Sequence, residues 1–491
     1  MSTLKERKEK FVSDLLGGSE YEIYLVTGVA LTAYMSFALL QKFNQNDLNL
    51  PIDYALNAVS ILLGITLYSS NPKYLHVIIA VPALLALVLS YQYQKDPKVN
   101  QNKKNNKDVN ILQRKSFVTA YRSHMIIITN FAILAVDFPV FPRRFAKVET
   151  WGTSLMDIGV GAFVFSMGLV NSRSLIRQTF DPSNSKYKFH FGTYLSLVWR
   201  NFVKSLPVLT LGLIRLVSVK SLEYQEHVTE YGIHWNFFFT LGALPIVIGI
   251  LDPILNYFPR ALVALVITST YELFLTKTDL LTFILRTDNR MDSLISQNKE
   301  GIFSFFGYLS IFIFGQSFGS FVLTSFKTPQ NLIKMSTYAE FVQSKKRKNS
   351  ISSWLTVSTT EGLIISTIFY QFLYRYVAES PSFNNVSRRM ANISYVLWVV
   401  SHSSTFLLGY NLVDRLVRRE NGETGSTLLE STNNNGLLCF LLGNLLTGLV
   451  NMTINTLDTG DAVAFGILCT YGAILATVAI LLNKNKIYIK I

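Results

Sequence analysis

The chain has 491 residues, of which 49% are hydrophobic and 15% are charged. Ordinary globular domains carry about 25% charged residues, and the apolar residues here come in long runs, so the composition excludes a disordered chain and argues against a water-soluble enzyme. On a soluble protein, a net charge of +14 would suggest that the protein binds nucleic acid. Because apolar runs separate the basic clusters, we attribute the excess to membrane topology and expect a lipid bilayer, not nucleic acid, as the partner.

Long apolar segments recur along the whole chain. About 20 apolar residues in a helix cross a hydrocarbon core of about 30 Å, and backbone groups in lipid must be satisfied within a helix. We therefore predict an all-α polytopic membrane protein with about 13 transmembrane helices. The predicted segments are 21–41, 51–69, 74–92, 119–137, 154–172, 203–219, 236–254, 259–276, 302–324, 355–377, 392–413, 436–457 and 462–482.

No internal repeat and no long linker divide the chain, so we expect residues 1–491 to form a single membrane domain. A polar N-terminal segment covers 1–20, and basic loops cover 93–117 and 325–350. No cleavable signal peptide is expected, because the first apolar segment is long enough to span. The two cysteines lie in apolar stretches, which excludes a disulfide framework and a cysteine-based metal site.

The distribution of Lys and Arg predicts the orientation. The third, fifth, ninth and eleventh loops and the C-terminal tail are the basic ones, and cytosolic loops are enriched in Lys and Arg. We predict that the odd-numbered loops and the C-terminus are cytosolic and that the N-terminus is lumenal. The basic cluster within residues 1–20 opposes this orientation.

The fourth loop, residues 135–157, is the most promising site for chemistry. Asp137 follows an apolar helix, where desolvation raises the pKa of a carboxyl toward that of a useful base. Arg143 and Arg144 suit a phosphate, and Lys147 suits an oxyanion. Two prolines predict a rigid connection. A belt of charges reaching toward the membrane interface is the alternative.

The sixth loop carries a second polar cluster. Four of its side chains have helical spacing and share one face: Glu223, Glu226, His227 and Glu230. A metal site is conceivable there, but without a zinc-binding motif we favour a solvated acidic face and assign no metal. His234 and Asn236 mark the entry of the next segment, where the histidine is either a general base or an interfacial anchor.

Two further residues stand out. His402 lies in the middle of the segment 392–413, and polar residues inside a membrane are costly. It serves either in interhelical hydrogen bonding or as the histidine of an intramembrane-histidine O-acyltransferase. Asn385 begins a glycosylation sequon in the tenth loop, whereas Asn392, in a second sequon, is expected to lie too close to the membrane.

Five stretches resemble the PIG-W family of glycosylphosphatidylinositol (GPI) inositol acyltransferases, most closely its fungal members. The resemblance runs from the first residues to the last and is weakest in the basic loops after the third and ninth segments. The five stretches are DFPVFPRRFAKVETWGTSLMDIGVG (137–161), LEYQEHVTEYGIHWNFF (222–238), EGIFSFFGYLSIF (300–312), SRRMANISYVLWV (387–399) and NGLLCFLLGNLLTGLVNM (435–452).

The resemblance implies an endoplasmic reticulum enzyme that moves a fatty acyl chain, usually palmitoyl, from acyl-CoA to an inositol hydroxyl of glucosaminyl-phosphatidylinositol. Acyl-CoA is then a co-substrate, and no other cofactor is implied. It also implies 13 spans, a cytosolic C-terminus and a target of antifungal inhibitors. Asp137 and Lys147 match the family's proposed catalytic aspartate and lysine.

The remaining candidates are expected to bind substrate. Arg143 and Arg144 are assigned to the lipid phosphodiester or to the phosphates of CoA. The glucosaminyl-inositol headgroup, which carries an amine and hydroxyls, is assigned to carboxylate, imidazole and amide groups of the sixth loop. These are Glu223, Glu226, His227, His234 and Asn236.

From composition and pattern alone, a secondary transporter is the main rival. Transporters typically show inverted repeats and broken helices at the midplane, and the sequence shows neither. The polar residues gather instead near one predicted face, which favours chemistry on a membrane-anchored substrate. The sequence carries no signal for an oligomeric state.

Overall fold

The computed structural model covers residues 1–491. It describes the chain except for residues 1–3, 45–47, 94–110, 113, 182–189, 222–227, 287, 289, 325–326, 328–330, 335–336, 339, 341, 344–355, 418–423 and 489–491. The described part is helical, and its only β-type pairs are the isolated bridges Gly18–Thr153 and Leu112–Thr324.

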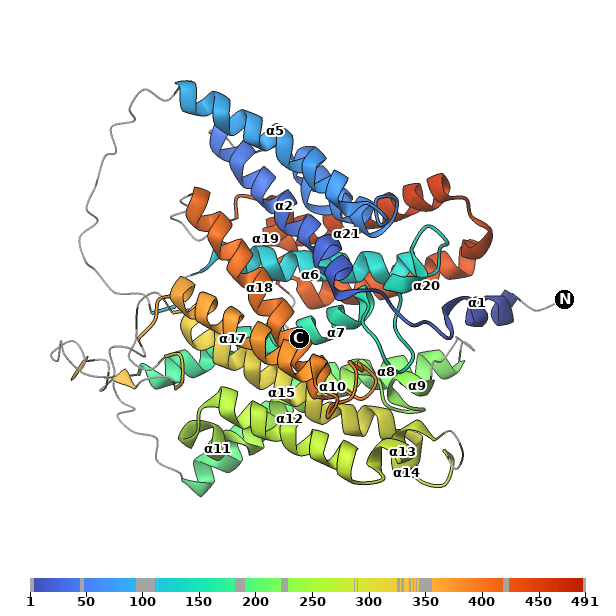
Figure 1. The fold of residues 1–491 in the computed structure, drawn as a ribbon, viewed down its shortest axis with the longest axis vertical. Coiled ribbons are helices and arrows are strands. Elements are labelled where there is room, and N and C mark those ends of the chain that lie inside the picture. Colours follow the sequence, from blue (N-terminus) through green and yellow to red (C-terminus); the bar gives the residue numbers. More distant parts are fainter. Residues whose placement is uncertain are drawn as a thin grey trace.

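Every predicted segment contains a helix of the structure (Figure 1). In the described residues, eight helices are long and apolar enough to cross a membrane. They are α2 (Glu20–Asn44), α6 (Ser116–Ala135), α7 (Leu155–Thr179), α8 (Phe191–Ser221), α15 (Lys299–Val322), α18 (Ile393–Val417), α20 (Gly436–Thr453) and α21 (Asp461–Lys484). The prediction of an all-helical, polytopic membrane protein is confirmed.

The remaining apolar segments form shorter or more polar helices. Leu50–Ile65 is divided into α3 (Leu50–Tyr54), η1 (Ala55–Val59) and α4 (Ser60–Ile65), and it is followed by α5 (Pro72–Tyr93). The other members of this group are α10 (Phe237–Ile250), α12 (Arg260–Lys277) and α17 (Thr359–Glu379).

Short helices fill several connections. They are α1 (Leu4–Val12), η2 (Arg143–Phe145), α9 (Val228–Tyr231), α11 (Asp252–Tyr257), α13 (Leu280–Leu285), α14 (Leu294–Gln297), α19 (Thr427–Asn434) and η4 (Thr456–Asp458). The segment 1–20, expected to be merely polar, thus includes the helix α1.

Glycines bring α7 and α15 into close contact near the centre of the bundle. A Cβ atom on Gly168 would lie 2.0 Å from the carbonyl oxygen of Phe312, and one on Gly315 would lie 2.2 Å from that of Phe165. Small residues of this kind let two membrane helices approach backbone to backbone. As a result α7, α15, α6 and α18 form the buried centre, while α8 is mostly exposed.

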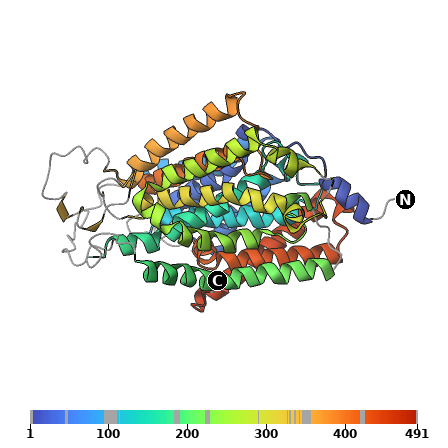
Figure 2. The ribbon, with the colours of Figure 1, turned by 90° about the horizontal axis from the view of Figure 1, so that it is seen from below.

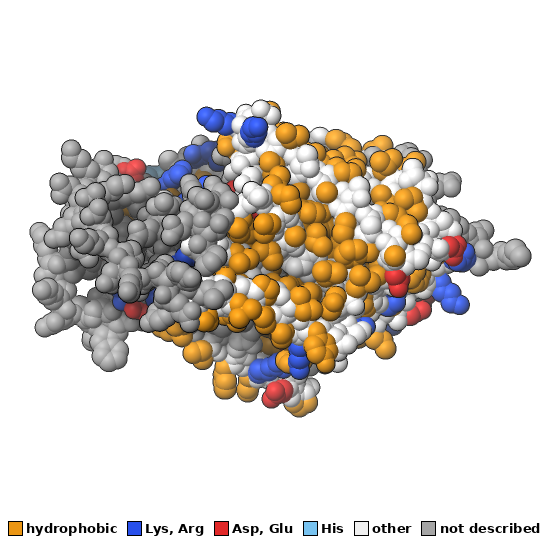
Figure 3. Space-filling view, turned by 90° about the horizontal axis from the view of Figure 1, so that it is seen from above, with side chains coloured by type: hydrophobic (Ala, Val, Ile, Leu, Met, Phe, Trp, Pro, Cys, Tyr) orange, Lys and Arg blue, Asp and Glu red, His pale blue; other side chains and the backbone are white. Residues whose placement is uncertain are grey.

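The outer surface is apolar in its middle part. Hydrophobic side chains cover most of the middle of one face, and the acidic and basic side chains seen there lie toward its edges (Figure 3). Large apolar side chains such as Leu85, Trp199 and Phe372 are more than half exposed. Such a surface is stable in lipid and unstable in water.

The long helices run roughly side by side, so the bundle has two ends (Figure 2). At one end, which we name the Asp137 end, Asp137 meets Asn451 of α20, and α1 pairs with Asp458. At the opposite end, which we name the Arg114 end, Arg114 pairs with Glu430 of α19. The helix α6 runs from the Arg114 end to the Asp137 end.

Candidate functional site

The fourth loop is a compact structure at the Asp137 end. Arg143 donates hydrogen bonds to the backbone carbonyls of Val136, Phe138 and Phe141, and its guanidinium stacks 3.9 Å above the ring of Phe11. Phe138 and Phe141 are fully buried. Arg143 thus ties the loop to its own backbone, as a rigid connection would require.

The N-terminal segment closes over the same loop. Gly18 donates a backbone hydrogen bond to Thr153, at 2.9 Å. Gly17 and Gly152 have positive φ angles of 82° and 140°, and a Cβ atom at either position would lie within 2.5 Å of a carbonyl oxygen of the other segment. Glycine is thus needed where the two backbones touch.

Asp137 lies one residue beyond the last turn of α6 and is partly exposed. Its Oδ2 accepts a 2.7 Å hydrogen bond from the side-chain amide of Asn451, whose own oxygen accepts one from Lys8 at 3.0 Å. Burial raises the pKa of Asp137 above its ordinary value, while the bond from Asn451 and the charges of Lys8 and Arg143 oppose that rise. The predicted direction of this pKa shift is confirmed.

Lys147 belongs to a second, separate charge system at the same end. Its Nζ lies 2.8 Å from a carboxylate oxygen of Glu230, which in turn lies 3.7 Å from Arg388. Arg388 Nε is 2.6 Å from Asp157. Asp157 accepts hydrogen bonds from Ser154, the residue that caps α7, and from the backbone N–H of Val148, at 2.7 and 3.1 Å.

The innermost ion pair of this charge network, Arg388–Asp157, is almost completely buried. Arg388 and Asp157 have side chains that are 4% and 1% exposed. Burial alone would lower the pKa of Arg388, but the carboxylates of Glu230 and Asp157 outweigh it and hold that pKa above its ordinary value. A buried charge with a partner on each side is stable, whereas removing one partner is costly. The network holds the backbone directly after Lys147 through the N–H of Val148.

Asp137 and Lys147 lie in the same loop and form no ion pair with each other. One is held by a neutral amide from α20, and the other by a carboxylate from α9. The structure thus places the two residues at one end of the bundle in separate polar environments.

The predicted binding residues have diverse surroundings. Arg144 forms an ion pair with Glu22 at 2.8 Å. His234 Nε2 lies 3.0 Å from Gln297 Oε1. Asn236 caps α10, because its Oδ1 accepts hydrogen bonds from Phe238 and Phe239. Glu223, Glu226 and His227 lie outside the described residues.

The two sequons differ in accessibility. Asn385 is exposed. Asn392 is fully buried, and its side chain bonds to the backbone of Ser387, Asn385 and Tyr395.

Sequence reasoning missed Arg388 and its neighbour Arg389. Arg389 and Arg290 both pair with Glu300, at 3.0 and 2.5 Å, and the Glu300 side chain has no exposed surface. The sequence did point to these two arginines, because SRRMANISY belongs to one of the five stretches that resemble the PIG-W family. Glu230 was noticed for its spacing but not as the partner of a lysine.

A small, partly open apolar cavity lies between α2, α6, α7 and α18. It is lined by Thr27, Ala30, Tyr121, His124, Met125, Ile128, Thr129, Leu155, Ile158, Gly159, Ala162, His402, Phe406 and Tyr410. A second small cavity lies between α6, α19, α20 and α21, with Phe131 and Cys439 among its lining residues. Neither cavity is lined by Asp137 or Lys147, but Leu155 directly follows the capping residue of α7.

His402 is held inside the first cavity. Its Nε2 lies 3.2 Å from Thr27 Oγ1, and its Nδ1 has no hydrogen-bond partner. Its ring packs between Tyr24 and Phe406 at centroid distances of 4.9 and 4.5 Å. In the described residues we find no group of three or more His, Cys, Asp or Glu side chains that could hold a metal ion.

Comparison with known proteins adds the remaining evidence. The GWT1 family model matches residues 4–482. The chain is 58% identical to GPI-anchored wall transfer protein 1 of Debaryomyces hansenii, 54% identical to that of Candida albicans and 43% identical to that of Saccharomyces cerevisiae, each over the full length of both chains. The chain therefore belongs to the GWT1 family, whose members are GPI inositol acyltransferases of GPI-anchor biosynthesis.

Proposed function

We propose that this protein transfers a palmitoyl chain from acyl-CoA to an inositol hydroxyl of glucosaminyl-phosphatidylinositol, with Asp137 as the general base. The observation that carries the proposal is the environment of Asp137. Its carboxylate is partly exposed, burial raises its pKa, and its hydrogen-bond donor is a neutral amide. Such a carboxylate is more basic than an ordinary aspartate.

The reaction needs a base because a sugar hydroxyl is a poor nucleophile at neutral pH. Asp137 takes the proton as the hydroxyl oxygen attacks the thioester carbonyl carbon. The carbon–sulfur bond then breaks, the inositol ester remains, and the proton passes to the departing CoA thiolate. No acyl-enzyme is formed in this scheme.

Lys147 stabilises the negative charge that develops on the thioester oxygen. A positioned cation in a site sheltered from water is worth far more than one in water. The ion pair with Glu230 holds Lys147 in place. The substrate competes with Glu230 for the ammonium group, which has three donors.

The glucosaminyl-inositol headgroup is assigned to the Asp137 end. The sixth-loop residues Glu223, Glu226 and His227 directly precede α9 in sequence, His234 follows it, and α9 supplies Glu230. For Arg143, Arg144 and Asn236, the intramolecular contacts support a role in shaping the site. A phosphate could still reach the outer edge of the Arg144 side chain, which is 37% exposed.

We further propose that all 13 predicted segments cross the membrane as one domain, with the Asp137 end in the lumen of the endoplasmic reticulum. An odd number of crossings puts the termini on opposite sides. In agreement, α1 lies at the Asp137 end, and Asn483 near the C-terminus bonds to Asn434 of α19 at the Arg114 end. The basic loops then lie in the cytosol.

The decisive experiment is acyl transfer by the purified protein in detergent, where no sealed compartment exists. Asp137→Asn is expected to reduce turnover by about 100- to 10,000-fold, and Asp458→Asn, an exposed aspartate at the same end, is the matched control. Near-normal turnover by Asp137→Asn would exclude it as the base. Membership in the GWT1 family sets aside the transporter alternative.

One observation favours a second mechanism. His402 lies in an apolar cavity with a free ring nitrogen, as an intramembrane-histidine acyltransferase would require. The apolar lining of the cavity also suits the acyl donor, and we favour a role in donor binding for it.

A further inference from the structure

Four arginines gather at the Arg114 end of the bundle. Arg114 precedes α6, Arg122 lies inside it, and Arg173 and Arg177 lie in the last turns of α7. Arg173 is close enough to Arg122, Arg114 and Arg177 for their like charges to repel. Arg114 and Arg177 are exposed and Arg122 and Arg173 are half-buried. Like charges held close together cost free energy unless an anion joins them.

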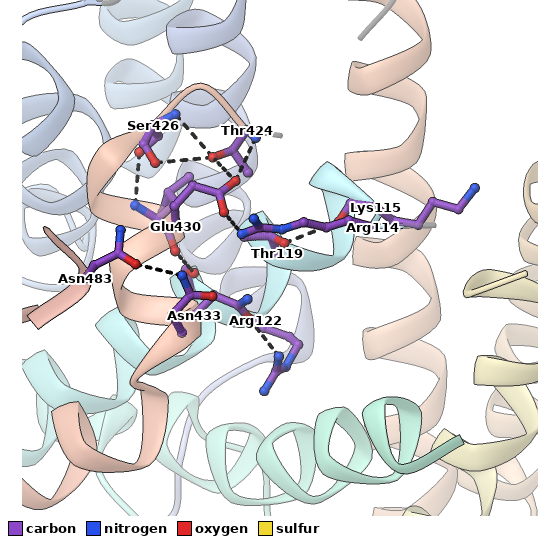
Figure 4. A network of polar contacts seen from close by, with 12 residues as sticks. Arg114, Lys115, Thr119, Arg122, Thr424, Ser426, Glu430, Asn433 and Asn483 are labelled. Atoms are coloured by element: carbon purple, nitrogen blue, oxygen red, sulfur yellow. Dashed lines mark hydrogen bonds and ion pairs between the residues drawn. The ribbon is translucent and has the colours of Figure 1, made fainter. Parts of the chain in front are cut away.

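Few carboxylates balance these charges. Glu430 pairs with Arg114, and Arg122 bonds only neutral groups, with Nε 3.0 Å from Ser166 and Nη1 2.6 Å from Asn433 (Figure 4). The other carboxylate near the start of α6, Asp414, accepts hydrogen bonds from Tyr34 and Ser116. Arg173 and Arg177 form no ion pair with a described carboxylate.

The cluster continues directly into the apolar cavity. On α7, residues 159, 162, 166, 173 and 177 share one face, because they repeat every three, four or seven positions. Ser166, which bonds to Arg122, is one helical turn from Ala162, and Arg122 is one turn from Met125 on α6. Ala162 and Met125 both line the cavity. One stripe of α7 therefore leads from the arginines to the cavity.

Resting on the proposed function, we propose that Arg122, Arg173 and Arg177, with Arg114 beside them, bind the phosphate groups of the CoA portion of the acyl donor. Guanidinium groups match phosphate oxygens in pairs, and a cluster of them suits a ligand with several phosphates. The pantetheine arm then runs along the seam between α6 and α7.

The lengths of the arm and of the seam agree. From Leu155 to Ser166, α7 rises about 17 Å at about 1.5 Å per residue. The pantetheine arm from phosphate to sulfur has about twelve bonds, the same number as the backbone of four residues. Its extended length is therefore about 14 Å. With its diphosphate at Arg122, which bonds Ser166, the donor brings its thioester close to Leu155, beside the capping residue of α7. Arg173 and Arg177 lie about 10 and 16 Å farther along α7, where the 3′-phosphate is expected. A donor from the Arg114 side thus reaches a reaction at the Asp137 end.

The test compares acyl donors with and without the 3′-phosphate of CoA. Arg173→Gln and Arg177→Gln should each raise the donor KM by about tenfold with kcat unchanged, and the double variant should lose most of the preference of the wild type for CoA over 3′-dephospho-CoA. The control is Arg375→Gln, which changes an exposed arginine at the Asp137 end. It should keep the donor KM of the wild type and its preference for CoA over 3′-dephospho-CoA. Arg122 is avoided because its contacts hold α6, α7 and α19 together.

Binding of unacylated CoA to the purified protein, measured by calorimetry, gives a readout that does not depend on turnover. Weaker CoA binding by the two variants supports the proposal. Unchanged CoA affinity and unchanged donor KM overturn it, as does a loss confined to binding of phosphatidylserine vesicles, which would assign the cluster to anionic lipid. If the wild type binds CoA at these arginines and transfers no acyl chain, only the proposed function fails.

Discussion

The side-chain amide of Asn451 donates a 2.7 Å hydrogen bond to Asp137, across 314 residues of sequence. It joins α20 to the end of α6, and Lys8 of α1 donates to the oxygen of the same amide. A neutral donor orients the carboxylate without the strong pKa depression that a direct arginine or lysine partner causes. Asp137 is thereby oriented, and its pKa lies above the ordinary value of an aspartate, as the proposed role of general base requires.

This relationship predicts the acid limb of the pH profile. Asp137 must be ionised to act, and burial raises its pKa above its ordinary value. The kcat/KM should therefore fall as the pH drops through a value above about 4, the ordinary range of an aspartate. Because the bond from Asn451 lowers this pKa, Asn451→Leu should shift the limb to higher pH.

The control for that shift is Asn444→Leu on the same helix, since Asn444 bonds only to the backbone of Phe440. Its acid limb should match that of the wild type. An unshifted limb in Asn451→Leu would argue that another group titrates in the reaction.

Glu230 should act through Lys147. Glu230→Gln removes the charge 2.8 Å from the lysine and is expected to lower kcat by about tenfold, against about 100-fold for Lys147→Ala. Because the two residues form one unit, the double variant should be no slower than Lys147→Ala. Steady-state kinetics of this cycle, with Glu361→Gln as an exposed ion-pair control, give the answer. Fully additive effects would contradict a positioning role for Glu230.

The buried pair Arg388–Asp157 should be a main source of stability at this end. Arg388→Met leaves Asp157 without its partner and is expected to cost about 3–5 kcal/mol. Arg375→Met, which breaks an exposed pair at 3.5 Å, should cost at most about 1 kcal/mol. Thermal unfolding in detergent measures both, and equal midpoints would show that the buried network does not stabilise the fold.

His402 should affect the donor more than the chemistry. His402→Ala enlarges the cavity it lines, so we expect a changed donor KM and a kcat within about threefold of the wild type, while Asp137→Asn loses turnover. Acyl-transfer kinetics with donors of several chain lengths test this. A correctly folded His402→Ala without turnover, beside an active Asp137→Asn, would instead establish the histidine mechanism.

Glycosylation should separate the two sequons in the tenth loop. Asn385 is exposed and Asn392 is fully buried, so a glycan is expected on Asn385 alone if the Asp137 end is lumenal. Asn385→Gln should abolish the glycosidase-sensitive mobility shift, and Asn392→Gln should leave it. Labelling of a cysteine at position 385 from the cytosol alone would reverse the proposed orientation.

The local features of the site could be predicted because they depend on neighbours in sequence. A carboxylate just after an apolar helix is desolvated, so the raised pKa of Asp137 followed from the stretch 135–157. The helical segments followed likewise from runs of apolar residues.

The partners could not be predicted in the same way. Lys147 meets Glu230 from 83 residues away, and Asp137 meets Asn451 from 314 away. Several other carboxylates and amides near the same predicted face were equally plausible as partners of these two residues. Arg143 was expected to bind phosphate, and its nitrogens bond backbone carbonyls of its own loop instead.

The sequence by itself determined that the chain is a bundle of membrane helices, because the transfer of each residue from water to lipid is a local property that adds up along a segment. The tertiary structure alone decided which charges meet. These helices are apolar on nearly all sides, so their sequences do not say which face turns inward. The pairing of Asp137, Lys147 and Arg122 with their partners depends on how α6, α7, α9, α19 and α20 pack together.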